Sequence, residues 1–494
     1  MSEFDNLPAS TPTLVAWAAV DQHEDDHQCA REPVVLMIDA TRQAAARAGG
    51  EALLQAVQRI SVPQGMWGYR DPARLVAQAI GAPQAHTEYA KFGILQQTLM
   101  ADACQRIQAG ELEVALVVGG EAKYRDLRAN IAGQQASLTQ QDETVTPDTT
   151  LEPDAELWLA AENNAGLGMA VGYYAILESA LRAARGQSIK ANRRHLGELY
   201  ARFSAIAANN PDAWRREVVS AEYLREPSAK NPMLAFPYTK LMNTSWNVDQ
   251  AAALVFCSVG KARALGIPPA QWIFPLGASE SNHMLAVSQR RLLAEPQAVR
   301  LMADALAQGT GISPASADLI DLYSCFPVAV ELVARGLGLP EGRDLTLTGG
   351  MAFAGGPLNN YLFQSTCRAA DLLQQGRGKT ALLSSVSGMF TKQALGLWSK
   401  TSPLCPFSFS DVSALAEACD APLEVRSDAE GEGVIVGYTV LFERGEPARL
   451  VAVIDLPDGS RAVAANTDAA LMQRLMQEEG VGLRVQVSGG VFGE

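Results

Sequence analysis

The arrangement of hydrophobic and polar positions divides this chain into two parts near residue 400. Upstream, short continuous apolar runs such as residues 13–20, 114–118 and 249–258 predict strands that are buried on both faces. Alanine-rich segments with helical spacing follow several of these runs. Because buried strands alternate with helices, the pattern predicts an α/β fold with mostly parallel sheets covered by helices.

The same pattern gives the other elements and the domain limits. Helices are expected at residues 34–46, 72–80, 89–109, 172–185, 193–208, 297–309, 328–336 and 360–375, and strands at residues 319–323 and 380–385. The strand at 114–118 is expected to end at Gly119. Residues 124–244 are more polar and less regular, which indicates an inserted loop region. We therefore expect one half at about 1–270, including the insertion, and a similar half at 271–402.

Beyond residue 400 the alternation of apolar strands and helices ends, and Pro403, Pro406 and Pro422 indicate a linker. Four strand-like runs separated by turn signals follow, with one short helix at residues 469–478. The runs are residues 433–443, 448–457, 460–465 and 482–487. This pattern predicts a small antiparallel barrel of OB type over residues 415–494.

The amino-acid composition limits the kinds of partner that the protein is expected to bind. The 494 residues carry a formal net charge of -14, so the charge balance predicts no sequence-independent binding of nucleic acid. The first residues lack a basic segment followed by an apolar one, and no apolar run is long enough to cross a bilayer. We therefore expect a cytoplasmic protein without a membrane span. Seven cysteines without paired spacing are typical of reduced thiols.

Two segments carry the most specific motifs. Residues 321–327 read Asp-Leu-Tyr-Ser-Cys-Phe-Pro, and residues 349–361 read Gly-Gly-Met-Ala-Phe-Ala-Gly-Gly-Pro-Leu-Asn-Asn-Tyr. Tyr323 and Cys325 alternate with Ser324 at the end of a predicted strand, so they are expected to point in one direction. Packing of a strand end against a helix start would explain the first segment equally simply. The polar, glycine-rich second loop favours a functional site over that alternative.

These segments resemble two active-site loops of the thiolase superfamily, the Asn-Glu-Ala-Phe or His-Asp-Cys-Phe loop and the Gly-His-Pro loop. Residues 110–122 are similar to the strand and Gly-Gly-x-Glu turn after the nucleophile helix, and residues 385–388 are similar to the Cys-x-Gly loop. The resemblance covers roughly residues 12–400 and extends to thiolase-like proteins of type 1 with an additional C-terminal domain. It implies a duplicated, five-layered αβαβα fold.

The resemblance also assigns positions for catalysis, and this chain departs from the family at each of them. Gly93 stands at or near the nucleophilic cysteine, Tyr323 at the Asn or His position, Gly356 at the His of Gly-His-Pro, and Ser385 at the acid/base cysteine. A hydroxyl is a poor substitute for an acid/base thiol. Cys104 lies too far along the nucleophile helix to be activated by the helix N-terminus and is expected to be a core thiol.

The resemblance implies a coenzyme A thioester as ligand, with no tightly bound cofactor. The candidate contacts are Lys230, Tyr238, Lys240, Asn359 and Asn360, although each lysine could equally be an ordinary solvated charge. The histidines and acids at residues 23–29 lack the spacing of a metal site, so no metal is expected.

Three functions follow from the resemblance. The first is an acyl-CoA-recognising protein of the acetyl-CoA acetyltransferase family, in which Tyr323 and Cys325 retain the chemistry. The second is a retro-aldol lyase on a 3-hydroxyacyl-CoA, with Tyr323 taking the hydroxyl proton and loop amides near Gly356 holding the thioester oxygen. The third is a non-catalytic binder or scaffold. A homodimer and a protein partner for the OB-like domain are also implied.

Overall fold

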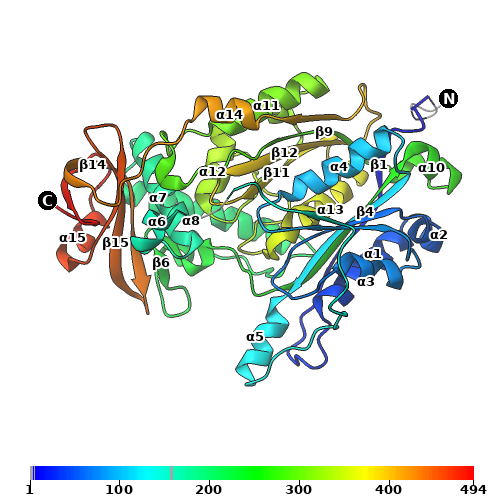
Figure 1. The fold of residues 1–494 in the computed structure, drawn as a ribbon, viewed down its shortest axis with the longest axis horizontal. Helices are drawn as coiled ribbons and strands as arrows, with labels where there is room; N and C mark the ends of the chain where they lie inside the picture. Colours follow the sequence, from blue (N-terminus) through cyan, green and yellow to red (C-terminus); the bar gives the residue numbers. More distant parts are fainter. Residues whose placement is uncertain (1–3, 5, 156–158) are drawn as a thin grey trace.

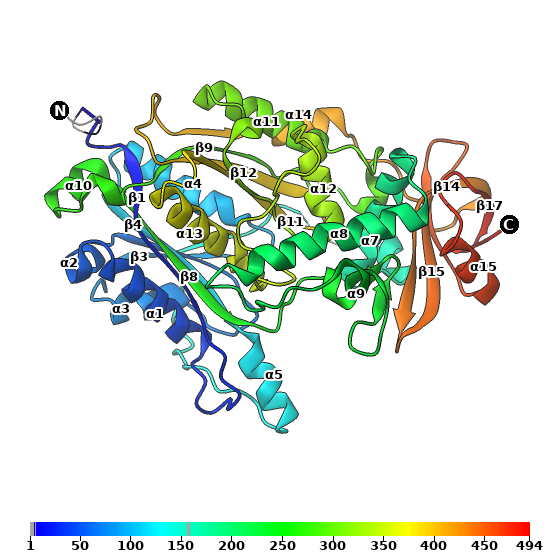
Figure 2. The same cartoon turned by 180° about the vertical axis from the view of Figure 1, so that it is seen from behind.

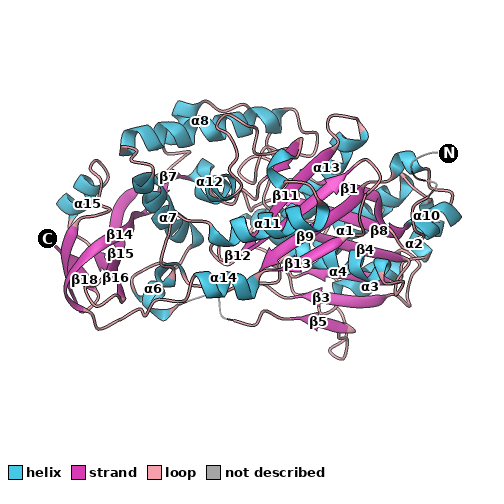
Figure 3. Ribbon diagram, turned by 90° about the horizontal axis from the view of Figure 1, so that it is seen from above, coloured by secondary structure: helices cyan, strands magenta, loops and turns pink. Residues whose placement is uncertain are grey.

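The computed structural model describes residue 4, residues 6–155 and residues 159–494. It is an elongated molecule with a two-sheet body and a barrel at its C-terminal end (Figures 1 and 2). Figure 3 shows the strands of the two sheets gathered in the body, with the barrel strands set apart from them. Among the described helices, none has the length and apolar character that crossing a membrane requires.

The first sheet belongs to the N-terminal half. Its strand order is β1-β8-β4-β2-β3-β5, and β8 runs antiparallel to both β1 and β4, whereas β2, β3 and β5 continue in parallel. The bounds are β1 Pro12–Asp21, β2 Arg59–Pro63, β3 His86–Ala90, β4 Val114–Ala122, β5 Thr149–Leu151 and β8 Asp249–Ser258. These strands are almost entirely buried, which explains their continuous apolar runs.

The second sheet has the order β10-β11-β12-β9-β13. Its bounds are β9 Phe274–Ser281, β10 Leu319–Asp321, β11 Thr380–Ser387, β12 Lys392–Ser399 and β13 Ser408–Asp411. The pair β10 and β11 is parallel, as is the pair β13 and β9, whereas β12 is antiparallel to both of its neighbours.

Helices complete the layers. α4 (Gln96–Gln108) and α13 (Tyr361–Gln374) contact strands of both sheets and therefore lie between them. α1 (Pro33–Ala46) and α3 (Pro72–Ala79) pack on the first sheet, and α11 (Gln297–Thr310) packs on the second. The sheets and helices thus form five layers, αβαβα, which confirms the predicted fold class.

Two element predictions were wrong. Residues 89–109 are not one helix: β3 continues to Ala90, and α4 begins only at Gln96. The reason is that β3 pairs with β2 and β5 on either side, and Gly93 then takes a φ of +99° that no helix contains. β4 does not end at Gly119 but runs to Ala122, because β8 pairs with it along its whole length.

The segment between β4 and β8 is mostly helical. Its elements are α5 Lys123–Ile131, α6 Ala160–Asn164, α7 Ala170–Ala184, α8 Ile189–Ala208, α9 Ala221–Arg225, β6 Met233–Ala235 and β7 Tyr238–Thr239. α5 projects from the body of the molecule (Figures 1 and 2). β6 pairs with a strand of the C-terminal barrel, and α7 packs on the same strand. This segment therefore connects the body to the barrel.

The C-terminal barrel is closed. Strand β14 pairs with β15 and with β17, and the ring continues through β16 and β18. The bounds are β14 Glu430–Glu443, β15 Glu446–Asp455, β16 Arg461–Asn466, β17 Arg484–Ser488 and β18 Val491–Gly493, with α15 at Ala469–Leu475. The barrel prediction is confirmed, although the pattern identified only four of the five strands, because β18 has only three residues.

Candidate functional site

The two loops that carry the sequence motifs are joined by the carboxylate of Asp321 at the end of β10. This carboxylate accepts hydrogen bonds from the backbone N–H of Leu347 at 2.7 Å and of Thr348 at 3.1 Å, and from the Tyr361 hydroxyl at 3.0 Å. Asp321 is buried, and burial raises the pKa of its carboxyl although these hydrogen bonds oppose the shift. The two loops are therefore held together at the edge between the sheets.

Tyr323 belongs to the first loop and meets Tyr361 of the second in a T-shaped ring contact, at 5.6 Å between ring centroids. Its backbone N–H donates to Ser384 Oγ at 2.8 Å. Burial raises the pKa of the phenol well above its usual value. The phenol therefore stays protonated at neutral pH, so it can donate a hydrogen bond but is a poor base.

Cys325 is 8% exposed, and its carbonyl oxygen accepts a hydrogen bond from Thr244 Oγ1 at 3.0 Å. Burial raises the pKa of the thiol to about 12, although a side-chain hydrogen bond with Tyr174 opposes the shift. A thiol with this pKa carries little thiolate at neutral pH and is a weak nucleophile.

Gly93 and Gly356, the positions that the resemblance assigns to the family's nucleophile and histidine, leave no room for a side chain. At Gly93, where φ is +99°, an added Cβ would lie 2.9 Å from Pro153 Cβ. At Gly356, an added Cβ would lie 2.1 Å from Thr244 Cγ2. Neither a cysteine at position 93 nor a histidine at position 356 fits this arrangement without displacing a neighbour.

Ser385 and Asn360 are buried polar side chains beside these loops. Ser385 lies on β11 opposite Ala394, and Asn360 precedes α13. Neither Ser385 Oγ nor the two polar side-chain atoms of Asn360 make a hydrogen bond with another described group of the protein. Asn359, next to Asn360, donates to the carbonyl oxygen of Gln64 at 2.8 Å. Cys104 is buried in α4, where burial raises the pKa of its thiol well above the usual value.

The other residues predicted to contact coenzyme A differ in their exposure and in whether they line a cavity. Tyr238 is buried, and its hydroxyl donates to Glu178 Oε2 at 2.7 Å and accepts from the backbone N–H of Val328. Lys230 is exposed and lines no described cavity, whereas Lys240 is exposed at the edge of one. Of these three residues, Lys240 is placed to meet a bound ligand.

That cavity, which we call the loop pocket, has a volume of about 520 Å³. Phe326 and Ala352, one from each motif loop, contribute to its wall. Its other walls are residues of the inserted region, among them Met169, Val171, Trp214, Arg215, Lys240, Leu241, Thr244 and Trp246. The wall is thus mainly apolar, with two cationic side chains.

The segment 243–247 connects the loop pocket to the motif loops. Besides the Thr244 bond to Cys325, the Ser245 carbonyl oxygen accepts from the N–H of Gly356 at 2.9 Å, and the Ser245 N–H donates to the carbonyl oxygen of Met351 at 2.9 Å. Sequence reasoning missed this segment. The only signal was its place at the end of the inserted region, directly before β8.

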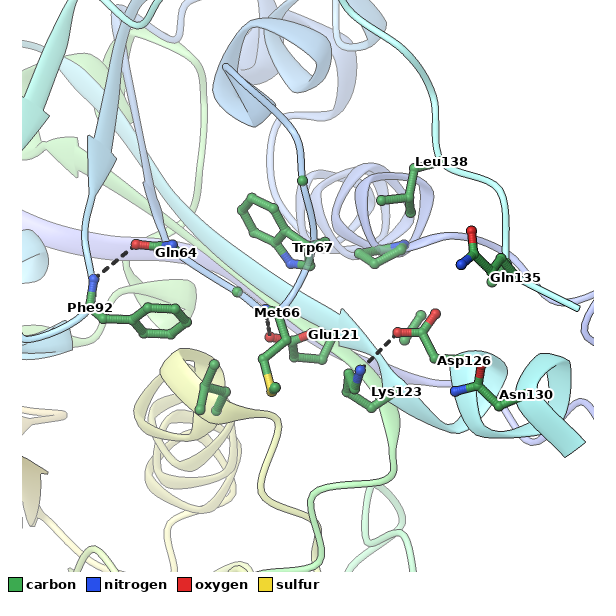
Figure 4. A pocket seen from close by; sticks show the side chains of 16 residues that line it. Gln64, Met66, Trp67, Phe92, Glu121, Lys123, Asp126, Asn130, Gln135 and Leu138 are labelled. Carbon is green, nitrogen blue, oxygen red and sulfur yellow. Dashed lines mark hydrogen bonds and ion pairs between the residues drawn. The ribbon is translucent and has the colours of Figure 1, made fainter. Parts of the chain in front are cut away.

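A second large cavity, of about 740 Å³, lies over the carboxyl end of β4 (Figure 4). Trp67, Met66 and Phe92 border it, and Glu121 lies at its base. The Glu121 Oε1 atom accepts from the backbone N–H of Met66 at 2.7 Å, and burial raises the pKa of its carboxyl to about 8. Neither Tyr323 nor Cys325 lines this cavity, and Leu358 is the residue of the motif loops in its lining.

The fold is that of the thiolases, and known structures agree. The crystal structure of a monomeric SCP2-thiolase like protein type 1 from Mycobacterium smegmatis is 26% identical, with a TM-score of 0.82 over 98% of this chain and 97% of that chain. The Ltp2-ChsH2(DUF35) aldolase is 17% identical, with a TM-score of 0.60 over 80% of this chain and 99% of that chain. An acetyl-CoA acetyltransferase from Syntrophomonas wolfei is 16% identical, with a TM-score of 0.57 over 79% of this chain and 99% of that chain.

The particular resemblance is to thiolase-like protein type 1. Residues 415–489 match the family model for the thiolase-like protein type 1 additional C-terminal domain. This match covers most of the closed barrel, and the crystal structure from Mycobacterium smegmatis matches nearly the whole chain. No curated protein sequence matches the chain. The chain therefore has the thiolase fold, resembles thiolase-like protein type 1, and carries a match to its additional C-terminal domain.

Proposed function

We propose that this protein recognises an acyl-CoA, or a related acyl thioester, in the loop pocket without forming an acyl-enzyme on a cysteine. One observation carries the proposal: the segment 243–247 lines the loop pocket and also holds both motif loops by hydrogen bonds. A ligand in the loop pocket would therefore lie against the loops that correspond to the thiolase catalytic loops.

The chemistry of the loop pocket supports the same ligand. Trp214, Trp246 and Leu241 offer apolar surface for an acyl or pantetheine chain. Lys240 and Arg215 supply positive charge for phosphate groups, which this strongly acidic chain could bind only at a local basic site. The protein named as an acetyltransferase among the structural neighbours shares the fold, and a thiolase of the same fold is known in complex with CoA.

The closed catalytic positions support recognition without acylation. Gly93 leaves no nucleophile at its loop, and the Cys325 thiol is buried and protonated. Claisen chemistry through a cysteine needs an ionised thiol that the substrate can reach. We propose that neither condition is met.

Calorimetric titration with CoA, acetyl-CoA and a longer acyl-CoA, combined with intact mass spectrometry, tests the proposal. We expect saturable binding without a covalent mass shift. Lys240→Glu should weaken binding about tenfold or more, because it replaces an attractive charge by a repulsive one. Lys230→Glu is the matched control, since Lys230 is equally exposed but lies outside the loop pocket. No binding of any thioester, or equal losses in both variants, would refute the assignment.

A retro-aldol lyase is the second candidate, and the aldolase among the structural neighbours is the observation that favours it. The raised pKa of Tyr323 argues against this phenol as the base. Release of an aldehyde or ketone from a 3-hydroxyacyl-CoA, lost in Tyr323→Phe with thioester affinity retained, would establish the lyase. Binding of a thioester with neither a cleavage product nor a covalent adduct would favour a carrier or scaffold role.

We also propose that the protein is a monomer and not the homodimer that the superfamily resemblance implies. The structural relative from Mycobacterium smegmatis is described as monomeric. In this chain the short strand β5 pairs along β3, so the chain itself covers that edge of the first sheet. Light scattering after size exclusion should give the mass of one chain, 52.7 kDa.

A further inference from the structure

Lys392 is a buried lysine that the proposed function does not use. It begins β12, directly after the turn that follows Ser385 and Ser387 on β11. The residue is 4% exposed, and its Nζ donates a hydrogen bond to the carbonyl oxygen of Gly93 at 2.7 Å. No carboxylate of a described residue lies within ion-pair distance of it. Burial without an ion-pair partner favours the neutral amine, and burial accordingly lowers the pKa of this lysine.

Two carboxyl groups share the face of the sheet with Lys392. Ala394, two residues further along β12, pairs with Glu280 on β9, and Glu280 in turn pairs with Asp411 on β13. Because side chains alternate along a strand, Lys392, Glu280 and Asp411 lie on one face of three neighbouring strands. Sequence reasoning missed this group, since the three residues are widely separated and come together only through the sheet register.

Glu280 is a buried acid held in a fixed position. Its carboxyl accepts hydrogen bonds from Thr98 Oγ1 at 2.8 Å and from Asn282 Nδ2 at 2.9 Å. Burial raises the pKa of this carboxyl, and those hydrogen bonds oppose the shift. On this face burial shifts the amine towards its neutral form and the acid towards its protonated form, and these are the forms that condensation with a carbonyl compound uses.

Lys392 opens onto a cavity of about 620 Å³. Thr98 and Asn282, the partners of Glu280, also line it. The other charged groups of its lining are acidic and comprise Glu152, Asp154, Asp411 and Glu417, together with His283, which bonds a backbone carbonyl. An acidic lining disfavours anionic ligands such as oxo acids and admits neutral ones. No residue of this cavity lines the loop pocket.

We propose that Lys392 is a carbonyl-binding residue whose amine condenses with a neutral aldehyde or ketone in this cavity. The Nζ lone pair attacks the carbonyl carbon, and the proton that the nitrogen loses passes to the carbonyl oxygen to give a carbinolamine. The carbinolamine hydroxyl then leaves as water with a proton that a carboxyl of the shared face supplies, and a C=N bond forms. Water is the only by-product, and the step needs no oxidant or reductant.

Reductive trapping tests the proposal on the unaltered chain. The protein is incubated with propanal and cyanoborohydride at neutral pH, and the alkylated fraction of each lysine is followed by peptide mass spectrometry. Lys400 is the internal control: burial also lowers its pKa, but it donates to the carbonyl oxygens of Ala270 and Trp272 and lines no described cavity. Since both lysines are measured in one sample, no folding defect can separate them.

We expect alkylation at Lys392 to be at least about tenfold faster than at Lys400, because of the two only Lys392 opens onto a described cavity that admits the aldehyde. Glu280→Gln should reduce that ratio, because it removes a carboxyl that supplies the proton. Equal or slower labelling of Lys392 would overturn the proposal. Glyoxylate, an anionic aldehyde, should label Lys392 more slowly than propanal does. Equal rates for the two aldehydes would show that the assigned ligand class is wrong. Lys392→Arg, which keeps a long side chain that can donate to the Gly93 carbonyl oxygen and removes the nucleophilic amine, should abolish the fast site.

Discussion

Two buried regions of this molecule differ in whether their polar side chains have hydrogen-bond partners. At the junction between the body and the barrel, Arg182 donates to Glu479 at 2.8 Å and to the Tyr438 hydroxyl at 3.0 Å. Arg461 bonds Asp455 and the backbone carbonyls of residues 288, 290 and 291. At the motif loops, by contrast, Asn360 and Ser385 hold buried polar atoms that bond to no other described group of the protein.

This difference in hydrogen-bond pairing distinguishes a region with a structural role from a candidate binding site. A buried charge is tolerated only when it is paired, and the junction meets that condition through several partners for each arginine. Unpaired buried amides and hydroxyls cost free energy and are rare unless a ligand or function requires them. We therefore propose that the motif loops keep the polarity of a binding site, while Gly93 and Gly356 leave no room for the side chains that the resemblance implies there.

The junction should be the more sensitive region. Replacing Arg461 by Met removes a guanidinium that is 2% exposed and leaves Asp455 and three carbonyl groups without their donor. Loss of one partner of a buried charged network costs about 3–5 kcal/mol. We expect the urea midpoint of unfolding to fall accordingly, and the barrel to become accessible to proteases first.

Arg426→Met is the matched control for Arg461→Met. Arg426 also pairs with an aspartate of the barrel, Asp458 at 3.0 Å, but its side chain is exposed to solvent. Solvent screens an exposed ion pair, so its loss should leave the urea midpoint nearly unchanged. If both variants lost the same amount of stability, the junction would not depend on buried pairing, and the comparison would fail.

Glu121 is intermediate between the two regions, because only one of its oxygens has a hydrogen-bond partner among the described groups. Its folded-state pKa is about 8, raised from 4.5 mainly by burial. The protonated form is favoured in the folded state, so stability from this group is complete below the unfolded pKa and is lost as pH rises towards 8. Wild type should lose roughly 2 kcal/mol relative to Glu121→Gln between pH 6 and pH 8.

Parallel urea titrations of wild type and Glu121→Gln at several pH values provide this measurement. Other buried carboxyls, such as Glu178 with a pKa of about 7, titrate in both proteins and cancel in the difference. A pH-independent difference would mean that Glu121 is ionised throughout the range and that its second oxygen is paired.

The sequence predictions succeeded where the signal was local and failed where it depended on contacts between distant segments. Continuous apolar runs such as β8 and β4, and the turn-separated strands of the barrel, are local signals, and they predicted the helix-covered sheets and the barrel, whereas the five layers were implied by the family resemblance. The sequence could not reveal that Pro153 covers Gly93, or that Thr244 fills the space beside Gly356, because these contacts join distant segments. Tyr238 and Lys240 looked equivalent in sequence, yet one is buried against Glu178 and the other is exposed.

Restoring the family's nucleophile should fail for steric reasons. Gly93→Cys places a Cβ 2.9 Å from Pro153 Cβ at a residue whose φ is +99°. A side chain in this backbone region costs about 1–3 kcal/mol before the clash is counted. We expect a lower unfolding midpoint and no acetyl-CoA-dependent mass shift at position 93. Acylation of the new cysteine would show that the loop can open, and that the closed arrangement is only one of its states.

The smallest effect is expected at Asn360. Asn360→Leu removes two buried polar atoms that have no described partner, so the change should alter the free energy of unfolding by no more than about 1 kcal/mol, because no hydrogen bond is lost. Asn231 offers a matched control: it is equally buried, but it donates to the carbonyl oxygens of Tyr223 and Leu224 and accepts from the N–H of Leu241.

Asn231→Leu should therefore lower the free energy of unfolding by about 2–4 kcal/mol, since it leaves three buried backbone groups without their hydrogen-bond partner. Urea unfolding of both variants at one pH compares the two sites directly. A large loss for Asn360→Leu would mean that the Asn360 amide is paired in solution. The motif loops would then be as well satisfied as the junction, and their unpaired polarity could no longer be taken as the remainder of a binding site.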